Sequence, residues 1–326
     1  FTPAQNDRER GSFLDTFPME YPGFGLGDYR KSAFQVRTKA GTTGCGLFFR
    51  SYRIYDGKPE IPGMPATFAK EDEAMTLELV CEDPENHLEI VLYYTAFSDV
   101  DAITRSVSFR NTGSEGITLT KTMSMSLDMD NREFETITLH GSWARERQID
   151  RENLGKGTFE VSSCRGESSH QEHPFLALVS KGTTEDYGQV YGFHFVYSGN
   201  FSAVAERSQF ESVRVVMGIN PEGFEWGLEP GEVFPLPEVV MVYSGHGLGD
   251  MSRTYHNLYR THLLRGIYKD APRPVLINNW EATYFDFNTD KLLAIAEEAA
   301  RCGIEMLVMD DGWFGRRSSD NCALGD

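Results

Sequence analysis

The sequence predicts a mostly β protein, in which a large two-sheet antiparallel β-sandwich is followed by a helix and then by one βαβ unit. Three observations support this prediction. From about residue 30 to residue 245, apolar and polar residues alternate with a period of two, as in strands that bury one face. Over residues 248–265 the period changes to three- and four-residue steps, which is typical of a helix. Near the C-terminal end, two short apolar runs enclose a second helical pattern, and this order requires parallel strands.

The strands of the sandwich are clearest at residues 117–127, where threonine and serine alternate with apolar residues. We expect a half-buried antiparallel strand whose buried face is made by Ile117, Leu119, Met123, Met125 and Leu127. Residues 103–109 repeat the pattern, and residues 111–113 supply the turn between the two strands. Further strands are expected at 74–81, 88–97, 133–140, 157–163, 174–180, 189–198, 201–207, 212–219 and 238–244. About a dozen strands of this kind are best accommodated in two packed sheets.

The predicted helix at residues 248–265 separates the sandwich from the C-terminal segment. Its apolar stripe consists of Leu248, Met251, Tyr255, Leu258, Tyr259 and His262. Asp250 can cap the start of this helix, and Gly266 comes directly after its end. The prolines of residues 270–274 stop any further helix. We therefore predict a sandwich domain at 1–247, a helical linker at 248–271 and the start of a second domain at 272–326.

The βαβ unit is predicted from strand-like segments at 275–281 and 306–314, with a helix from Asn288 to Gly303 between them. Asn288 or Thr289 is a suitable N-cap for that helix. Parallel strands release their polar ends at the same edge of a sheet, where α/β enzymes keep their functional residues. We therefore expect the acidic and aromatic residues of the two strand ends to gather there, namely Trp280, Glu281, Asp310, Asp311 and Trp313.

Carboxylates beside flat aromatic faces suit a sugar, which has hydroxyls on its rim and C–H groups on its faces. The two carboxyl groups of a glycosidase lie about 5–5.5 Å apart, or about 6.5–9.5 Å apart, on either side of the scissile bond. Neighbouring residues such as Asp310 and Asp311 are poorly placed for that task, so we interpret them as acceptors for sugar hydroxyls. Trp280 would supply a stacking face. The alternatives are a solvated loop for the aspartates, a core position for Trp280 and a structural ion pair for Glu281.

Metal and cofactor sites are not predicted. Five aspartates near the C-terminal end could offer oxygen ligands to Mg²⁺ or Ca²⁺, but they have no known loop spacing. His170 and His173 are spaced as zinc ligands can be, but no cysteine or third histidine lies near them in the sequence. The chain also lacks a Gly-rich phosphate loop and a Gly-x-Ser-x-Gly motif.

Composition excludes several classes of partner. The formal net charge of −18 and the pI of about 4.9 disfavour binding to nucleic acid or anionic lipid. No apolar run approaches the roughly 20 residues that span a bilayer. The five cysteines are odd in number and widely spaced, which favours free thiols in a reducing compartment. We expect a cytoplasmic protein, although secretion stays open because the chain does not begin with Met.

Several motifs together resemble one known family. The two strand ends contain Asn278-Asn-Trp-Glu-Ala-Thr-Tyr-Phe285 and Asp310-Asp-Gly-Trp-Phe-Gly315. The sandwich region adds Glu20-Tyr-Pro22, Asp28-Tyr-Arg30, Gly141-Ser-Trp-Ala-Arg-Glu-Arg147, Arg165-Gly-Glu-Ser-Ser-His-Gln171 and Pro174-Phe175. In this order, over nearly the whole chain, they resemble glycoside hydrolase family 36, the microbial α-galactosidases.

The resemblance implies a β-supersandwich, a linker helix and a (β/α)8 barrel, of which this chain holds the first βαβ unit. It also implies retaining hydrolysis of terminal α-linked galactose from sugars such as raffinose or melibiose, without metal or cofactor, in a homotetramer. By motif, Trp280 would line the galactose pocket, and Asp310 and Asp311 would accept hydrogen bonds from the O4 and O6 hydroxyls. The family's nucleophile and acid/base lie on later barrel strands, so no catalytic residue is assigned in this chain.

Two alternatives to this interpretation stay open. The motifs do not separate an α-galactosidase from a related α-N-acetylgalactosaminidase or α-galactosyl transferase. The chain could also be a non-catalytic β-sandwich that serves as a scaffold or oligomerisation module. The Gly- and Pro-rich segment from Tyr55 to Pro65 is a candidate interface for such a module, with an ordinary surface loop as the other interpretation.

Overall fold

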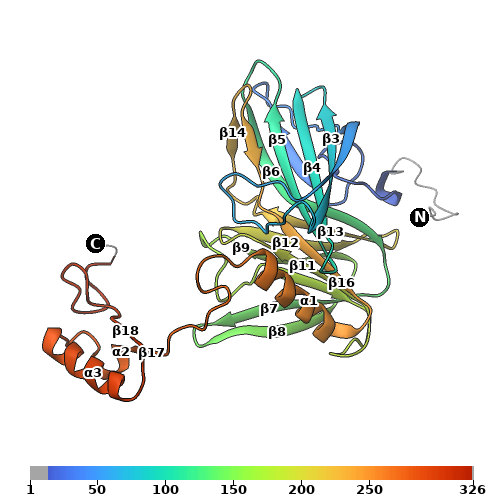
Figure 1. Ribbon diagram of the computed structural model, residues 1–326. Coiled ribbons are helices and arrows are strands. Elements are labelled where there is room, and N and C mark those ends of the chain that lie inside the picture. The colour runs from blue at the N-terminus through green and yellow to red at the C-terminus, as the bar shows by residue number, and fades with distance from the viewer. Residues whose placement is uncertain (1–13, 325–326) are drawn as a thin grey trace. The chain divides into compact units, whose positions relative to one another are not determined.

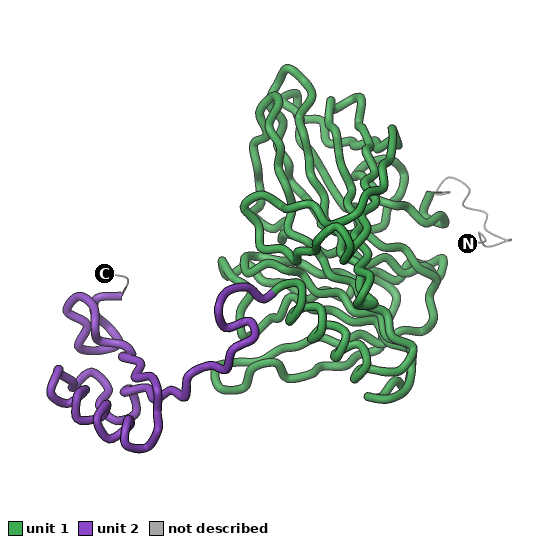
Figure 2. Tube along the Cα trace, viewed as in Figure 1, with its two compact units in different colours: residues 1–263 green, residues 264–326 purple. Residues whose placement is uncertain are grey.

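The computed structural model describes residues 14–324 of the chain. These residues form two compact units that divide after Leu263, shown in green and purple in Figure 2. Figure 1 shows the strands and helices of both, with labels where there is room. Within the described range, no helix is long and apolar enough to cross a membrane.

The first unit consists of two large antiparallel sheets (Figure 1). In the six-stranded sheet, β14 (Trp226–Leu228) pairs with β6, and the order is β1 (Phe34–Arg37), β6 (Ile117–Asp130), β13 (Ser212–Ile219), β12 (Phe201–Arg207), β9 (Gly157–Ser163). In the ten-stranded sheet, β15 (Val233–Pro235) pairs with β5, and the order is β2 (Phe48–Asp56), β3 (Ala74–Asp83), β4 (Leu88–Phe97), β5 (Ala102–Asn111), β16 (Val239–Ser244), β11 (Val190–Phe195), β10 (Phe175–Val179), β7 (Glu135–Ser142), β8 (Arg145–Asn153). This arrangement confirms the predicted mostly β, two-sheet sandwich.

Five strands of the sandwich were not predicted: β1, β2, β8, β14 and β15. Three of them are only three or four residues long. The other two, β2 and β8, are the edge strands of the ten-stranded sheet, and nearly all their residues are exposed. Alternation of apolar and polar residues identifies a strand only when one face is buried, so these edges gave no such signal.

Strand β6 is buried more completely than predicted. Thr122, Ser124 and Ser126, expected on a solvent-facing side, are as buried as the methionines between them. The expectation of a half-buried strand is therefore wrong for the middle of β6. The pairing of β6 shifts register twice, once against β1 and once between Met217 and Gly218 of β13. Such bulges interrupt the regular alternation of faces. A Cβ on Gly218 would lie 2.6 Å from the Cα atom of Met123, so only glycine fits at the second bulge.

The hydrophobic core lies between the two sheets. Phe34 of β1 and Phe109 of β5 meet there with ring centroids 6.0 Å apart, and both side chains are fully buried. Tyr21 stacks on Phe34 at 5.5 Å and donates a hydrogen bond from its hydroxyl to the carbonyl oxygen of Met123 at 2.5 Å. The segment before β1 therefore becomes part of the core.

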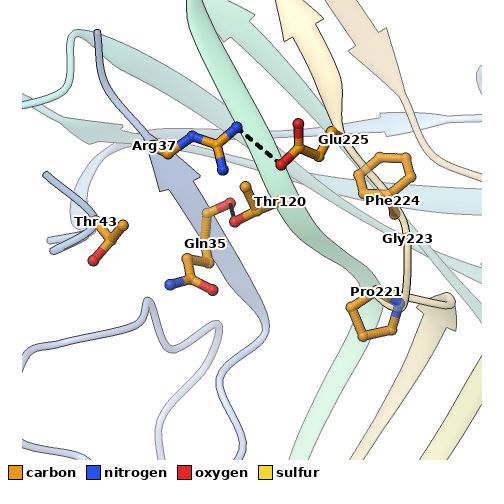
Figure 3. A pocket seen from close by; sticks show the side chains of 8 residues that line it. All are labelled: Gln35, Arg37, Thr43, Thr120, Pro221, Gly223, Phe224 and Glu225. Carbon is orange, nitrogen blue, oxygen red and sulfur yellow. Dashed lines mark hydrogen bonds and ion pairs between the residues drawn. The ribbon is translucent and has the colours of Figure 1, made fainter. Parts of the chain in front are cut away.

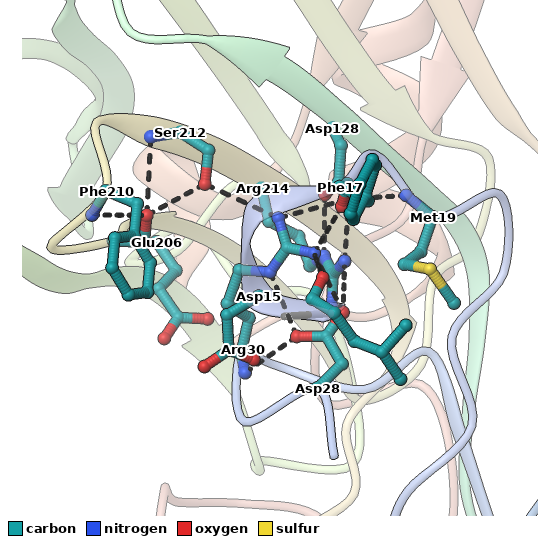
Figure 4. A network of polar contacts seen from close by, with 12 residues as sticks. Asp15, Phe17, Met19, Asp28, Arg30, Asp128, Glu206, Phe210, Ser212 and Arg214 are labelled. Atoms are coloured by element: carbon teal, nitrogen blue, oxygen red, sulfur yellow. Dashed lines mark hydrogen bonds and ion pairs between the residues drawn. The ribbon is translucent and has the colours of Figure 1, made fainter. Parts of the chain in front are cut away.

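A buried network of charges holds the same segment to β6 and β13 (Figure 4). Arg214 of β13 contacts Asp28 at 2.8 Å and Asp128 of β6 at 2.6 Å. Arg30 adds a contact of 2.9 Å to Asp28, and these side chains are at most 3% exposed. Burial by itself would raise the pKa of Asp28, but the guanidinium groups of Arg30 and Arg214 outweigh it and lower that pKa.

Helix α1 (Gly247–His262) packs on the ten-stranded sheet in the first unit. A side chain on Gly192 of β11 would lie 2.8 Å from the sulfur of Met251, so glycine lets the helix approach closely. Tyr255 donates to the carbonyl oxygen of Val240 at 3.2 Å. The helix begins three residues earlier than Asp250, which accepts a hydrogen bond from Ser244 at 2.9 Å and does not cap it. The predicted division at residues 247 and 271 stays a prediction.

The second unit contains the βαβ arrangement. Strands β17 (Leu276–Asn278) and β18 (Met306–Val308) pair in parallel, with α2 (Trp280–Thr283) and α3 (Thr289–Arg301) between them. Asn288 caps α3 as predicted, because its side chain accepts from the Lys291 amide at 3.0 Å. The strands are shorter than the predicted segments. Trp280 and Glu281 belong to α2, because the chain turns into that helix directly after Asn279.

Candidate functional site

The candidate site lies where β17 and β18 end. Its centre is the Asn279 side chain, which is fully buried. The Oδ1 atom of Asn279 accepts the Asp310 amide at 2.8 Å, and its Nδ2 atom donates to the Thr283 hydroxyl at 2.8 Å. One buried amide therefore fixes the segment after β18 to α2. Sequence reasoning missed this role, although two adjacent asparagines at a strand end were a visible signal.

Asn278 joins two of the predicted site residues. Its Nδ2 atom donates to the Oδ2 atom of Asp310 at 2.5 Å, and its Oδ1 atom accepts from the Trp280 amide at 2.8 Å. The parallel pairing places Asn278 opposite Val308, two residues before Asp310. Asn278 therefore links the backbone of Trp280 to the carboxylate of Asp310, while the gathering of their side chains in one site stays a prediction.

Asp311 is paired with a buried arginine. The Nε and Nη2 atoms of Arg317 each lie 2.7 Å from an oxygen of Asp311. The same guanidinium donates to the carbonyl oxygens of Ser319 and Cys322 at 2.9 and 2.7 Å, so it also shapes the loop after it. Hydrogen bonding from Arg317 lowers the pKa of Asp311, which keeps the carboxylate ionised at neutral pH.

Trp280 is half-buried, and its edges are held by two aromatic rings. The ring centroids of Tyr284 and Phe285 lie 5.3 and 4.9 Å from the indole, at nearly perpendicular angles. The Arg317 guanidinium carbon is 5.6 Å from the Phe285 ring centroid. A continuous series of contacts therefore links Trp280 through Phe285 and Arg317 to Asp311.

The other two residues expected at this edge have different contacts. Glu281 accepts a hydrogen bond from the Tyr284 hydroxyl at 3.2 Å. Trp313 is 63% exposed and its ring contacts Phe314 at 5.2 Å. Neither residue contacts Asp310 or Asp311 through a hydrogen bond within residues 14–324.

The hydrogen bonds leave a limited number of acceptor positions on the two carboxylates. An ionised carboxylate has about four lone-pair sites. Each Asp310 oxygen already accepts one bond, from the Asp311 amide and from Asn278. In Asp311, Oδ1 accepts from Gly312 and Arg317, and Oδ2 accepts from Arg317 alone. Asp310 therefore keeps one free site on each oxygen, and Asp311 keeps one on Oδ2. The pair is suited to bind several hydroxyl donors.

The described residues contain no group of three or more His, Cys, Asp or Glu side chains that could hold a metal ion. His173 stacks on His194, with ring centroids 5.5 Å apart. All five cysteines are free thiols.

The sandwich carries a separate open hollow of about 560 Å³, shown in Figure 3. Arg37 and Glu225 line it and form an ion pair of 2.9 Å with each other. The main charges of this hollow are therefore already paired.

Two models of known protein families match the chain. Residues 1–229 match the model of the glycosyl hydrolase family 36 N-terminal domain, and residues 233–326 match the melibiase model. The chain belongs to glycosyl hydrolase family 36. Within that family, it is 51% identical to the α-galactosidase AgaA of Geobacillus stearothermophilus over the whole chain and 45% of that relative. It is 48% identical to the α-galactosidase Mel36A of Lactobacillus acidophilus, with 96% of this chain and 43% of the relative covered.

Solved structures of family 36 agree with this assignment. The crystal structure of AgaA matches 96% of this chain and 44% of its own, with a TM-score of 0.93 and 52% identity. A variant of AgaA in complex with raffinose matches the whole chain and 46% of its own, with a TM-score of 0.94 and 51% identity. The chain thus spans less than half the length of the curated relatives it matches.

Proposed function

We propose that this chain forms the N-terminal part of a retaining α-galactosidase that hydrolyses terminal α-linked galactose from oligosaccharides such as raffinose or melibiose. Membership of family 36 supports the reaction class. The observation that carries the proposal is the hydrogen-bond network in which Asn278 joins the Trp280 amide to Asp310, and Asp310 accepts the Asp311 amide, at the ends of two parallel strands. In this proposal the two carboxylates hold the sugar, and the nucleophile and acid/base come from residues outside this chain.

The free acceptor sites define how the sugar is held. The O4 and O6 hydroxyls of galactose would donate to the open sites on Asp310 and Asp311, and Trp280 would line the pocket. Glucose differs at O4, which is equatorial, so one of these hydrogen bonds would be lost. A hydrogen bond to a charged group contributes about 1.5–3 kcal/mol, which corresponds to about 10- to 150-fold in affinity. The carboxylate pair would therefore select galactose over glucose.

The proposal can be tested on the chain itself. We expect galactose to bind at least tenfold more tightly than glucose by NMR titration, and Asp310→Ala to remove that preference. Glu297→Ala, on the exposed surface of α3 in the same unit, is the matched control and should bind both sugars as before. Equal binding of the two sugars would contradict the selection. This chain should not hydrolyse an aryl α-galactoside. Hydrolysis that survives the double change Asp310→Ala/Asp311→Ala would show that other residues of this chain are catalytic, which contradicts the proposal.

We further propose a homo-oligomer, a tetramer in the complete enzyme. The support is the loop from Lys58 to Thr67, which overlaps the segment from Tyr55 to Pro65 and is fixed at both ends. Lys58 forms a buried ion pair of 2.8 Å with Glu238, and the amide of Thr67 donates to the same carboxylate, so both ends of the loop are fixed. Exposed Tyr52 and Ile54 of the edge strand β2 adjoin it. Light scattering after size exclusion should give four subunits, and Lys58→Ala should weaken assembly. A monomer at micromolar concentration would contradict the proposal.

A cytoplasmic location is also proposed. The free state of all five thiols supports it, because disulfides are uncommon in reducing compartments. Fractionation of the source cells should recover the protein with cytoplasmic markers, and recovery from the culture medium would argue against this location.

A further inference from the structure

A second group of polar side chains lies on the sandwich, where the hairpin of β7 and β8 meets the segment between β9 and β10. It surrounds a hollow of about 440 Å³ lined by Glu146, Arg147, Ser169, His173, His194 and Tyr197. The Gly141 amide donates to the carbonyl oxygen of Gln171 at 3.2 Å, and His140 contacts the Glu172 carboxylate at 2.8 Å. The hairpin and the segment are therefore joined through residues 140–141 and 171–172.

Two neutral imidazoles form one wall. His173 and His194 stack at 5.5 Å with an angle of 18° between the rings. Burial lowers the pKa of His173 to about 4 and that of His194 to about 3, with further repulsion from Arg147. The Nδ1 atom of His194 is hydrogen-bonded to the Tyr259 hydroxyl of α1. Burial raises the pKa of Tyr259, so this hydroxyl keeps its proton and the contact joins two neutral groups.

Arg147 supplies a cation without a partner. Its backbone has a φ of +55°, in the left-handed region, and within residues 14–324 its guanidinium forms no ion pair or hydrogen bond. The carboxylate of Glu146 accepts from the Ala144 amide at 3.0 Å and also lines the hollow. This arrangement differs from the hollow of Figure 3, where Arg37 and Glu225 neutralise each other.

We propose that this hollow is a second, non-catalytic binding site for a neutral saccharide, made only of residues of the sandwich. The nitrogens of a neutral imidazole are one donor and one acceptor, and a sugar hydroxyl can match either. His194 has only its Nε2 atom left for this purpose, because its Nδ1 atom is bonded to Tyr259. Arg147 adds donors, and the Tyr197 ring adds an apolar face for C–H groups. The volume falls within the range of about 300–1,000 Å³ that is usual for small-molecule sites. A phosphate or carboxylate ligand would instead face the charge of Glu146. The site goes beyond the proposed function and does not depend on it.

The test uses the whole chain carrying Asp310→Ala and Asp311→Ala, which removes the first site. Raffinose, sucrose and galactose are titrated while the ring signals of His173 and His194 are monitored by NMR. We expect both rings to shift with one dissociation constant on the order of 1 mM for at least one of these sugars. Arg147→Gln should weaken binding about tenfold, the effect of one lost charge-assisted hydrogen bond. Arg145→Gln removes the same charge from the same strand without lining the hollow, and should bind as before.

Three results would overturn the proposal. The first is that the NMR signals of His173 and His194 do not shift with any of the three sugars. This measurement uses a chain in which no residue of the hollow is changed. The second is that Arg147→Gln and Arg145→Gln bind sugar equally well, with the amide spectrum showing both to be folded. The third is that inorganic phosphate or glucuronate binds more tightly than the neutral sugars. Loss of galactose selection by Asp310→Ala alone would concern only the first site.

Discussion

Arg317 holds Asp311 through two parallel hydrogen bonds of 2.7 Å, and the arginine side chain is only 7% exposed. The fork of the guanidinium matches the two carboxylate oxygens and fixes their plane. In the same contact Arg317 uses two of the roughly four acceptor sites of Asp311, and Gly312 uses a third. The arginine thereby decides which single acceptor position of Asp311 stays open to a further hydrogen bond.

Replacement of Arg317 by lysine should disturb this arrangement, because an ammonium group is a point charge and cannot grip both oxygens. We expect galactose affinity to fall about fivefold through the loss of one oriented acceptor. The pKa of Asp311 should rise toward its usual value, which NMR of the carboxyl carbon can measure. The exposed neighbour Arg316→Lys is the control and should change neither quantity. Unchanged affinity in Arg317→Lys would show that Asp311 is not a ligand of the sugar.

Asn279→Ala should release the Asp310 backbone from α2. The change leaves the part-buried amide of Asp310 without its side-chain acceptor, at a cost of about 1 kcal/mol, whereas the Thr283 hydroxyl keeps the backbone carbonyl oxygen of residue 279 as a partner at 3.2 Å. We expect weaker galactose binding together with faster hydrogen exchange at the Asp310 amide. Asn288→Ala removes the cap of α3 at a cost of about 1 kcal/mol and should leave galactose binding intact. If both variants lost affinity to the same degree, unit stability and not the position of Asp310 would be responsible.

The buried charges of the sandwich should make stability depend on pH. The pKa of Asp28 is lowered in the folded protein, so its contribution is present above the unfolded pKa of about 3.9 and is lost as pH falls through the folded value. Asp28→Asn should lower the free energy of unfolding at pH 7 by about 3–5 kcal/mol, because it leaves Arg214 and Arg30 incompletely paired.

In the same network, the pKa of Asp15 is shifted in the opposite direction to that of Asp28. Burial and the nearby charge of Asp28 raise the pKa of Asp15, so its ionised form is disfavoured in the folded state as pH rises through that value. Asp15→Asn keeps an oxygen for the Tyr29 amide and should be neutral or stabilising at pH 7. Urea unfolding at pH 5 and pH 7 measures both variants. A comparable loss of stability in the two would contradict the assigned directions.

The cysteines should differ in the rate at which their thiols react. Hydrogen bonds from Ser319 and Ser318 lower the pKa of Cys322 to about 7, whereas burial raises the pKa of Cys45 and Cys81 to about 11. At pH 7.5 iodoacetamide should therefore label Cys322 within minutes and leave the two buried thiols unlabelled in the native protein. Ser319→Ala should slow the labelling of Cys322. Mass spectrometry of the labelled peptides gives the rates, and an unchanged rate in Ser319→Ala would exclude this hydroxyl as the cause.

The roles of Trp280, Asp310 and Asp311 in sugar binding stay a prediction, which was made from the strand ends and from the resemblance of their motifs to family 36. The structure adds the residues that position them. The adjacent asparagines were a visible signal at the strand end, but the contacts of Asn279 and Arg317 could not be deduced from the sequence, because they run across turns whose geometry no periodicity encodes. The sequence also did not predict that Trp280 lies in α2, because the chain changes direction within two residues of the end of β17.

The sequence by itself determined the two-sheet sandwich and the parallel pairing after it, because burial of one face imposes a period of two and a strand–helix–strand order admits only parallel strands. Only the tertiary structure decided which strands form the edges, that both faces of the middle of β6 are buried, and which donors occupy the oxygens of Asp310 and Asp311. Those properties come from contacts between residues distant in sequence, such as Asp128 with Arg214 and Asn278 with Asp310, and each is fixed only when the chain has folded.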